Sequence, residues 1–361
     1  MKPMIPIATI ILAAGKGTRM KSPKAKVLHH VFFEPMLHHV LRAVAPLQAE
    51  RSIVIVGHQK EAVEAVLTSF AVNCVEQKEQ KGTGHAVLCA EQALADFNGN
   101  VMILCGDTPL LQYQHLQQMI TAHENGNTPL TIMTTRLADP TNYGRIISDH
   151  SGNVTAVVEE KDATEQQRLI TEINAGIYCV EKRFLFDAVK RITTNNAQGE
   201  MYVTDIVGIA VSDNYRVQTY EHPCPGHVLG VNSRSELAQA HREIQARRNE
   251  ALLANGISMH HPPTISIAPT AVIGQNTILA QNITISGNSQ IGKNCTIDQG
   301  VSITNARIGN DVMIGANSVI LNSTIASNTI IEPGTIIKSE IPESDSRGPS
   351  LRKDPDLPGA V

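Results

Sequence analysis

Residues 5–20 read IPIATIILAAGKGTRM, an almost wholly apolar run that ends in a glycine-rich loop. Ala8–Leu12 is rich in β-branched residues, which is typical of a buried strand in a parallel sheet. A signal peptide is the alternative for such an N-terminus, but its cleavage region would run straight into the loop, so we favour the strand. The bare amides around Gly15 and Gly17 can approach an anion, and Arg19 can add a guanidinium fork.

The loop differs from two common nucleotide-binding motifs. A dinucleotide fingerprint needs glycine where Met20 stands, and the four-residue spacing before the end of a Walker loop is absent. The alternatives that remain are a phosphate loop of another class and a tight turn without a ligand. Because ligands of parallel sheets bind at the carboxyl ends of strands, we favour the phosphate loop.

Strand and helix patterns alternate on either side of this loop over residues 1–232. Apolar runs at Ser52–Gly57, Asn100–Cys105 and Leu130–Thr135 are separated by helical patterns such as Met36–Ala45. This alternation predicts an α/β domain with a doubly wound, mostly parallel sheet covered on both faces.

A connecting helix is expected over residues 233–256. Ser233–Asn255 contains neither glycine nor proline and is rich in strong helix formers, and Gly256 is well placed as its C-terminal cap.

A repeat of about six residues follows over residues 257–338. Small or turn-forming residues often come after the repeated apolar position, as in Ile273-Gly274 and Ile314-Gly315. Such a hexapeptide pattern predicts a left-handed parallel β-helix of about four turns, whereas an ordinary sandwich would alternate with period two. The repeated positions are Ile or Leu at 267, 273, 279, 285, 291, 297, 303, 308, 314, 320, 325, 331 and 337. Residues 339–361 lack this period, and we expect a flexible tail.

Composition restricts the possible partners. The chain has 361 residues with 30 Lys and Arg against 34 Asp and Glu, a formal net charge of −4, so no broad basic surface for nucleic acid is expected. No apolar run approaches the length of a membrane helix. The six cysteines form no C-x-x-C pair, which favours reduced thiols in a cytoplasmic protein and no zinc site.

The loop also belongs to an ordered series of motifs. With Lys26-Val27-Leu28-His29 after it, the chain resembles the sugar-nucleotide pyrophosphorylases, and among them the uridyltransferase half of the bacterial bifunctional enzyme that makes UDP-N-acetylglucosamine. The resemblance covers residues 5–338. The further motifs are residues 77–86 (QKEQKGTGHA), 105–110 (CGDTPL), 142–146 (NYGRI), 158–163 (VEEKDA), 172–176 (EINAG), 196–200 (NAQGE) and 230–232 (GVN).

The resemblance implies a Rossmann-like nucleotidyltransferase that joins UTP to N-acetylglucosamine 1-phosphate with Mg²⁺. It implies Arg19 and Lys26 as catalytic residues that hold the phosphates, and Asp107 and Asn232 as metal ligands. It further implies a homotrimer assembled through the β-helix. The implied substrate contacts are Leu12, Ala13, Ala14, Gly15, Gln77, Gly82, Thr83, Gly144, Glu159, Asn174 and Asn232.

Two residues depart from the family pattern. Ala25 stands where a proline is usual, so the loop before Lys26 is expected to be less rigid, and Cys105 stands where tyrosine is common. The Cys105 change leaves open a different sugar or base, and a non-catalytic scaffold is a further alternative. A Cys105–His85 nucleophile is disfavoured because the chemistry needs no covalent step.

The full-length family enzyme also carries an acetyltransferase with a catalytic histidine in a longer β-helix. No histidine follows His261 in this chain, so no acetyl transfer is expected.

Overall fold

The computed structural model describes residues 5–339, which form two compact units, the first ending at Glu243 and the second beginning at Ile244. The division falls within the helix α8 (Arg234–Ala254), which matches the expected connecting helix and is followed by Gly256 at φ +87°. Except for Ser339, the tail expected over residues 339–361 lies outside the described residues.

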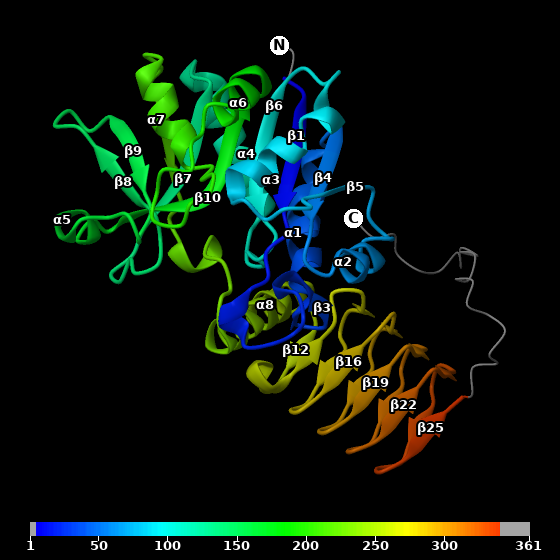
Figure 1. Cartoon of the computed structure of the whole chain (residues 1–361). Coiled ribbons are helices and arrows are strands. Elements are labelled where there is room, and N and C mark those ends of the chain that lie inside the picture. The colour runs from blue at the N-terminus through cyan, green and yellow to red at the C-terminus, as the bar shows by residue number, and fades with distance from the viewer. Residues whose placement is uncertain (1–4, 340–361) are drawn as a thin grey trace. The chain divides into compact units, whose positions relative to one another are not determined.

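A mixed sheet forms the centre of the first unit (Figure 1). Its strands run in the order β11-β7-β10-β6-β1-β4-β5, and the ribbon β8–β9 pairs with β10. The central strand β1 pairs in parallel with β4 and β6, whereas β10 is antiparallel to β6 and β7. The strands are β1 (Ile7–Leu12), β4 (Arg51–Val56), β5 (Asn73–Glu76), β6 (Asn100–Cys105), β7 (Leu130–Arg136), β8 (Arg145–Ser148), β9 (Val154–Val158), β10 (Glu172–Glu181) and β11 (Gln218–Glu221).

Apolar side chains project from both faces of this sheet into two buried clusters. In β1, Ala8 and Ile10 enter one buried cluster with residues of α3, α6 and α7, while Ile11 enters a second cluster with residues of α1, α2 and α4. This arrangement confirms the doubly wound α/β fold and the strand interpretation of the N-terminus. The helices are α1 (Met36–Val44), α2 (Lys60–Val66), α3 (Thr83–Cys89), α4 (Tyr113–Gly126), α5 (Glu165–Arg168), α6 (Lys182–Val189) and α7 (Asp205–Ser212).

Short segments connect these elements. The hairpin β2 (His30–Val31) and β3 (Glu34–Pro35) precedes α1. The single-turn 3₁₀ helices are η1 (Thr18–Met20), η2 (Lys26–Leu28), η3 (Ala45–Leu47), η4 (Gln92–Leu94), η5 (Pro225–His227) and η6 (Pro262–Thr264).

Within residues 5–339, no helix is both long and apolar enough to cross a membrane.

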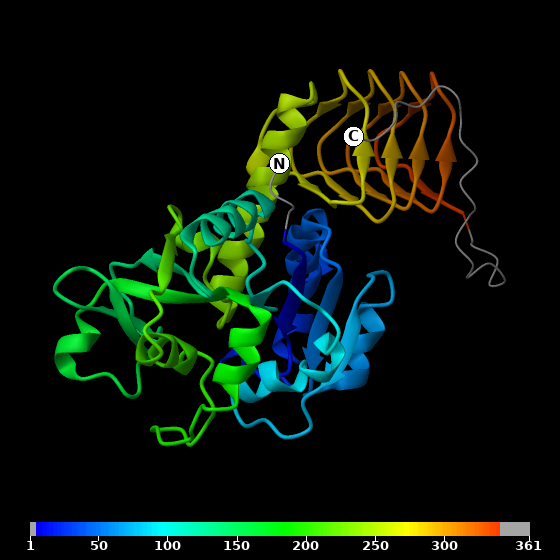
Figure 2. The same cartoon turned by 90° about the horizontal axis from the view of Figure 1, so that it is seen from above.

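The second unit is a parallel β-helix whose coils stack one after another (Figure 2). Its strands build three sheets, in the orders β12-β15-β18-β21-β24, β13-β16-β19-β22-β25 and β14-β17-β20-β23. Every predicted anchor position lies in one of these strands, which confirms the hexapeptide repeat. The strands are β12 (Ser258–Met259), β13 (Ser266–Ile267), β14 (Val272–Ile273), β15 (Ile278–Leu279), β16 (Thr284–Ser286), β17 (Gln290–Ile291), β18 (Thr296–Ile297), β19 (Ser302–Thr304), β20 (Arg307–Ile308), β21 (Met313–Ile314), β22 (Val319–Leu321), β23 (Thr324–Ile325), β24 (Ile330–Ile331) and β25 (Ile336–Lys338).

The corners between the strands use residues that tolerate positive φ. Asn276 and Asn294 adopt φ near +60° at successive levels, and the side-chain amide of Asn294 donates to Asp311 at 3.0 Å one coil further on. Asparagine adopts this conformation more readily than other residues with a Cβ. The corner residues thus complement the apolar anchors in specifying the coil.

Replacing Ile303 with alanine is expected to lower the free energy of unfolding of the second unit by about 2–5 kcal/mol. Ile303 is fully buried, and its strand β19 pairs with both β16 and β22. The matched control is Ile336→Ala, which truncates a side chain that is 73% exposed and should cost less than about 0.5 kcal/mol. Urea titration followed by circular dichroism measures both, and equal losses would contradict the assignment of Ile303 as a core anchor.

Candidate active site

Several functional segments leave the sheet at the same edge. β1 and β6 are neighbouring parallel strands, in which Ile7 pairs with Asn100 and Leu12 pairs with Cys105. The glycine loop after β1 and Asp107 after β6 therefore lie at the carboxyl ends of adjacent strands. The next strands, β4 and β5, end at the same edge, and Gln77 directly follows β5. Crevices at this edge are where open α/β sheets bind ligands.

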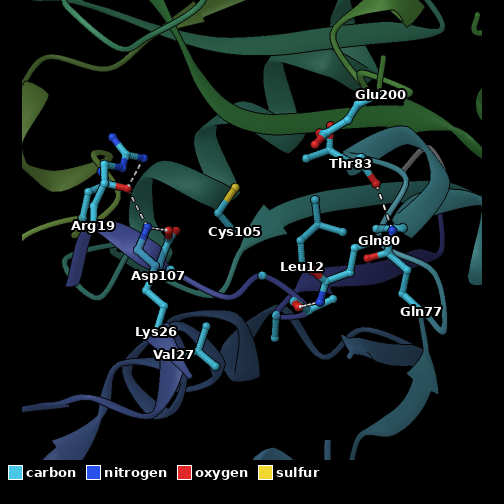
Figure 3. A pocket seen from close by; sticks show the side chains of 17 residues that line it. Leu12, Arg19, Lys26, Val27, Gln77, Gln80, Thr83, Cys105, Asp107 and Glu200 are labelled. Atoms are coloured by element: carbon cyan, nitrogen blue, oxygen red, sulfur yellow. Dashed lines mark hydrogen bonds and ion pairs between the residues drawn. The ribbon is translucent and has the colours of Figure 1, made fainter. Parts of the chain in front are cut away.

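A pocket of about 520 Å³ opens at this edge (Figure 3). Arg19, Lys26 and Asp107 lie together at one end of it, and Gln77 and Thr83 lie at the other. The pocket brings together most of the residues predicted from the sequence. These are Leu12, Ala13, Ala14, Gly15, Arg19, Lys26, Gln77, Gly82, Thr83, Asp107 and Asn232.

The cationic end of the pocket is organised around Lys26. Its ammonium group donates to the carboxylate of Asp107 and, at 2.6 Å, to the amide oxygen of Asn232. Arg19 donates to the same Asn232 oxygen at 2.7 Å. Two cationic side chains and one carboxylate are therefore concentrated where a polyanionic ligand could be neutralised.

Lys26 is held by the residue before it. Ala25 is fully buried at φ −53°, which is close to the angle that proline would impose, and its N–H donates to Gln59 Oε1 at 2.6 Å. A proline has no N–H and could not make this bond. The hydrogen bond to Gln59 is therefore a restraint on the loop that only a non-proline residue allows.

Asn232 is held by the start of α8. The Glu236 carboxylate accepts from the backbone N–H groups of Asn232 and Ser233, while the Ser233 hydroxyl accepts from the N–H of Glu236 at 3.2 Å. This reciprocal pattern is a capping box, which fixes where a helix begins. The helix start thereby places Asn232 beside Lys26.

Two glycines make room for the charged side chains. Gly17 has φ +68°, and a Cβ there would lie 2.5 Å from the Cβ of Lys26. A Cβ at Gly230 would lie 3.1 Å from the Asp107 carboxylate. Gly17 is therefore required by both its backbone conformation and its space, whereas a side chain at Gly230 would have to displace the Asp107 carboxylate.

The opposite end of the pocket is built on a loop contact. Gln77 is 5% exposed, and its amide donates to the carbonyl of Gly82 at 3.0 Å. Gly82 has φ +100°, and a Cβ there would lie 2.5 Å from the carbonyl oxygen of Met201. The Thr83 hydroxyl accepts from the N–H of Val203, so the segment that follows Glu200 braces this end.

Glu200 and Gln80 also line the pocket, although the sequence did not predict them as site residues. Gln80 donates to the carbonyl of Ala14 at 2.8 Å, which links the two pocket loops. Glu200 ends the motif at residues 196–200, but the fold alone brings it beside Gly82 and Thr83 (Figure 3). No local pattern distinguishes it from a surface glutamate.

Cys105 lies between the two ends of the pocket (Figure 3). Burial, with the nearby Asp107 carboxylate as a smaller cause, raises the pKa of its thiol to about 12. The thiol therefore stays protonated near neutral pH and is a poor nucleophile, which supports rejecting the Cys105–His85 hypothesis. Its sulfur lies 3.7 Å from the Gly176 carbonyl oxygen, on β10.

The three predicted sugar contacts form a separate group around β8, β9 and β10. Gly144, Glu159 and Asn174 do not line the pocket described above. They contact one another, because the N–H of Asn174 donates to the Gly144 carbonyl at 2.9 Å and the Glu159 carboxylate faces Gly144. Cys105 connects this group to the pocket, since Gly176 lies two residues after Asn174.

The Glu159 side chain is partly buried among these sugar contacts. Burial raises its pKa, and the neighbouring Asp162 and Asp205 act in the same direction, whereas a 3.2 Å bond from the Thr204 hydroxyl opposes the rise. The side chain of Asn174 is also committed locally, because it donates to the Tyr178 hydroxyl at 2.7 Å and accepts from the N–H of Gly176 at 3.0 Å. These contacts hold both side chains in defined orientations.

The donor set at the cationic end fits a hard divalent cation. Asp107 and Asn232 each direct an oxygen at the single ammonium group of Lys26, so the two oxygens converge on one cation. Over residues 5–339, no group of three or more His, Cys, Asp or Glu side chains could hold a metal. Mg²⁺ suits such a sparse set, since it takes its remaining ligands from phosphates and water.

A family model for nucleotidyl transferases matches residues 8–223 of the chain. The chain belongs to the nucleotidyl transferase family. This match spans nearly the whole sheet and every pocket residue except Asn232, so the expectation of a nucleotidyltransferase enzyme is confirmed. Members of the family act on a nucleotide and a sugar phosphate and use a divalent metal ion.

Relatives of this nucleotidyl transferase include proteins named bifunctional protein GlmU. That of Desulfotalea psychrophila is 53% identical over 268 residues, which cover 74% of this chain and 79% of that protein. Those of Thermobifida fusca and Geobacter sulfurreducens are 45% and 46% identical, each over 71% of this chain and 54% of the relative. The chain thus spans about half the length of these two relatives, and the resemblance drawn from its motifs is confirmed over 71–74% of the chain.

Proposed function

We propose that this protein transfers the uridylyl group of UTP to N-acetylglucosamine 1-phosphate, which gives UDP-N-acetylglucosamine and pyrophosphate. The observation that carries the proposal is the convergence of Arg19, Lys26, Asp107 and Asn232 at one end of the pocket. In this reaction a phosphate oxygen of the sugar phosphate attacks the α-phosphorus of UTP. The bond from that phosphorus to the β-phosphate oxygen breaks, and pyrophosphate leaves with the bonding pair.

The attacking group needs no general base. The second pKa of a phosphate monoester is about 6, so the sugar phosphate is mostly a dianion near neutral pH. The difficulty is to bring two anions together in line, and catalysis of phosphoryl transfer is mainly positioning and charge neutralisation. Lys26 and Arg19 supply fixed positive charge, and the bare backbone near Gly15 allows a phosphate to approach closely.

We assign the pocket end at Gln77, Gly82 and Thr83 to the base and the group Gly144, Glu159 and Asn174 to the sugar. A side-chain amide offers both a donor and an acceptor, which suits the imide edge of uracil. Mg²⁺, held by Asp107 and Asn232, would supply additional charge neutralisation on the phosphates. The six free cysteines suit the reducing conditions of the cytoplasm, where we place the reaction.

The direct test is pyrophosphate release from UTP with a panel of sugar 1-phosphates. N-acetylglucosamine 1-phosphate should give the highest kcat/KM, EDTA should abolish the release, and added Mg²⁺ should restore it. Another preferred sugar would correct the substrate, and silence with the whole panel would remove the proposal. A scaffold that only binds sugar nucleotides would show binding without pyrophosphate release.

Glu159→Gln is expected to raise the KM for the sugar phosphate while raising Tm at neutral pH. Because the folded-state pKa of Glu159 lies above its unfolded value, the partly buried carboxylate costs stability above the folded pKa. That cost disappears as the pH falls below the unfolded pKa of about 4.3, so the Tm difference should shrink towards pH 4. The control is Glu165→Gln, at an exposed position of α5, and a lower Tm for Glu159→Gln at pH 7 would contradict the expectation.

We further propose that the β-helix joins copies of the chain, and the resemblance implies three. One of its sheets exposes apolar side chains at the same register position of three strands, namely Ile278, Met313 and Ile330, which are 39%, 52% and 69% exposed, with Thr296 between the first two. Light scattering should give the mass of a trimer, and Met313→Glu should shift it towards the monomer. A monomeric parent at micromolar concentration would refute the assembly.

We also propose that residues 257–338 carry out no acetyl transfer. The support is chemical, because the histidines of this segment, His260 and His261, precede its first repeat anchor at Ile267 and none follows them to act as a base. Incubation with acetyl-CoA and glucosamine 1-phosphate should leave both unchanged, and measurable N-acetylglucosamine 1-phosphate would overturn this part.

A further inference from the structure

Arg145 is the largest fully buried side chain in the described part of the chain, with only 1% of its surface exposed. It lies in β8, within a ribbon at the margin of the sheet, where an apolar residue would be less costly to bury. Its Nε–H has no hydrogen-bond partner, so burial of this guanidinium is not fully compensated. Such a group calls for an explanation other than stability.

The side chain of Arg145 connects the segments that flank two of the sugar contacts. Nη1 donates to the carbonyl of Tyr143, and Nη2 donates to the Glu160 carboxylate at 2.8 Å. Tyr143 directly precedes Gly144, and Glu160 directly follows Glu159. A third bond, from Nη2 to the carbonyl of Arg168 at 3.3 Å, attaches the same group to α5.

The backbone of Arg145 makes a corresponding junction. In the sheet register Arg145 pairs with Val158 of β9 and with Ile173 of β10. Glu159 and Asn174 are the next residues after these two partners. One arginine is therefore adjacent to all three predicted sugar contacts, through its neighbour Gly144 and through its two cross-strand partners.

We propose that Arg145 is a positioning residue that sets the spacing of Gly144, Glu159 and Asn174 and so determines recognition of the sugar without touching it. This inference rests on the proposed function, which assigns those three residues to the acceptor. The fork of the guanidinium spans two segments at once, which a single ammonium cannot do in the same geometry. The residues that line the nucleotide pocket belong to other strands and loops and should be unaffected.

The test compares Arg145→Lys and Glu160→Gln with the parent. KM is measured for N-acetylglucosamine 1-phosphate at saturating UTP and for UTP at saturating sugar phosphate, together with Tm. Arg145→Lys should raise the KM of the sugar phosphate about tenfold and leave that of UTP within about twofold. It should also reduce the preference for N-acetylglucosamine 1-phosphate over glucose 1-phosphate. Glu160→Gln, which keeps the arginine, should show a smaller shift in the same direction.

A matched control is Arg51→Lys. Arg51 also makes a forked ion pair, with Asp96, and bonds a carbonyl, that of Ala93, but its elements carry no predicted sugar contact. This variant should retain both KM values. A parent-like sugar KM in Arg145→Lys, or equal rises in both KM values, would overturn the inference, and Glu160→Gln decides by the same criteria if Arg145→Lys does not fold. Failure of the proposed function would instead appear in the parent, as absence of pyrophosphate release.

Discussion

Asp107→Asn is expected to lower kcat for pyrophosphate release by about 10²–10³-fold, the usual effect of removing one preorganised electrostatic group. The substitution keeps the shape of the side chain and removes the charge that accepts from Lys26 and is proposed to hold Mg²⁺. The fold should be retained, because the backbone bonds of this loop, from Gly106 to Leu12 and from Val231 to Asp107, do not use the carboxylate. A coupled pyrophosphate assay at several Mg²⁺ concentrations measures the effect.

The control for this substitution is Asp96→Asn. Asp96 also pairs with a basic side chain, that of Arg51, but its carboxyl group is 78% exposed and lies outside the pocket. Its kcat should match that of the parent. If Asp107→Asn retained more than about a tenth of the parental kcat at all Mg²⁺ concentrations, the carboxylate would have no place in the phosphate site.

Lys26→Met is expected to lower kcat by about 10²-fold, because a fixed positive charge at the reacting phosphates is lost while the length of the stem is kept. The loss of kcat should exceed that caused by removing an exposed charge nearby. The Lys26 side chain is only 13% exposed, so water screens its charge little. Steady-state kinetics with both substrates saturating separate this effect on kcat from an effect on binding.

Lys24→Met provides the comparison within the same loop. Lys24 is exposed and does not line the pocket, so its removal changes the net charge equally without removing a contact. Similar losses of kcat in the two variants would show that the charge acts at long range, and the assignment of Lys26 to the phosphates would then be wrong.

A large part of the fold could be predicted because its signals are local. The β-helix follows from apolar anchors six residues apart, and all of these positions lie in its strands. The central strands of the sheet follow from short apolar runs, and β6 begins and ends at the expected residues Asn100 and Cys105. In both cases neighbouring residues in the chain already specify which side chain must be buried.

The residues of the active site could not be predicted from local sequence patterns alone. Arg19 and Asn232 are 213 residues apart, and only the resemblance to a known family pointed to both as site residues. Their 2.7 Å contact forms only when the chain folds. Glu200 and Arg145 had no assigned role because nothing in their immediate surroundings separates them from solvated residues. The sequence by itself determined the elements and the repeat, since periodicity acts over a few residues. Tertiary structure decided which loops meet at the sheet edge and which buried charge braces them, since those contacts join segments far apart along the chain.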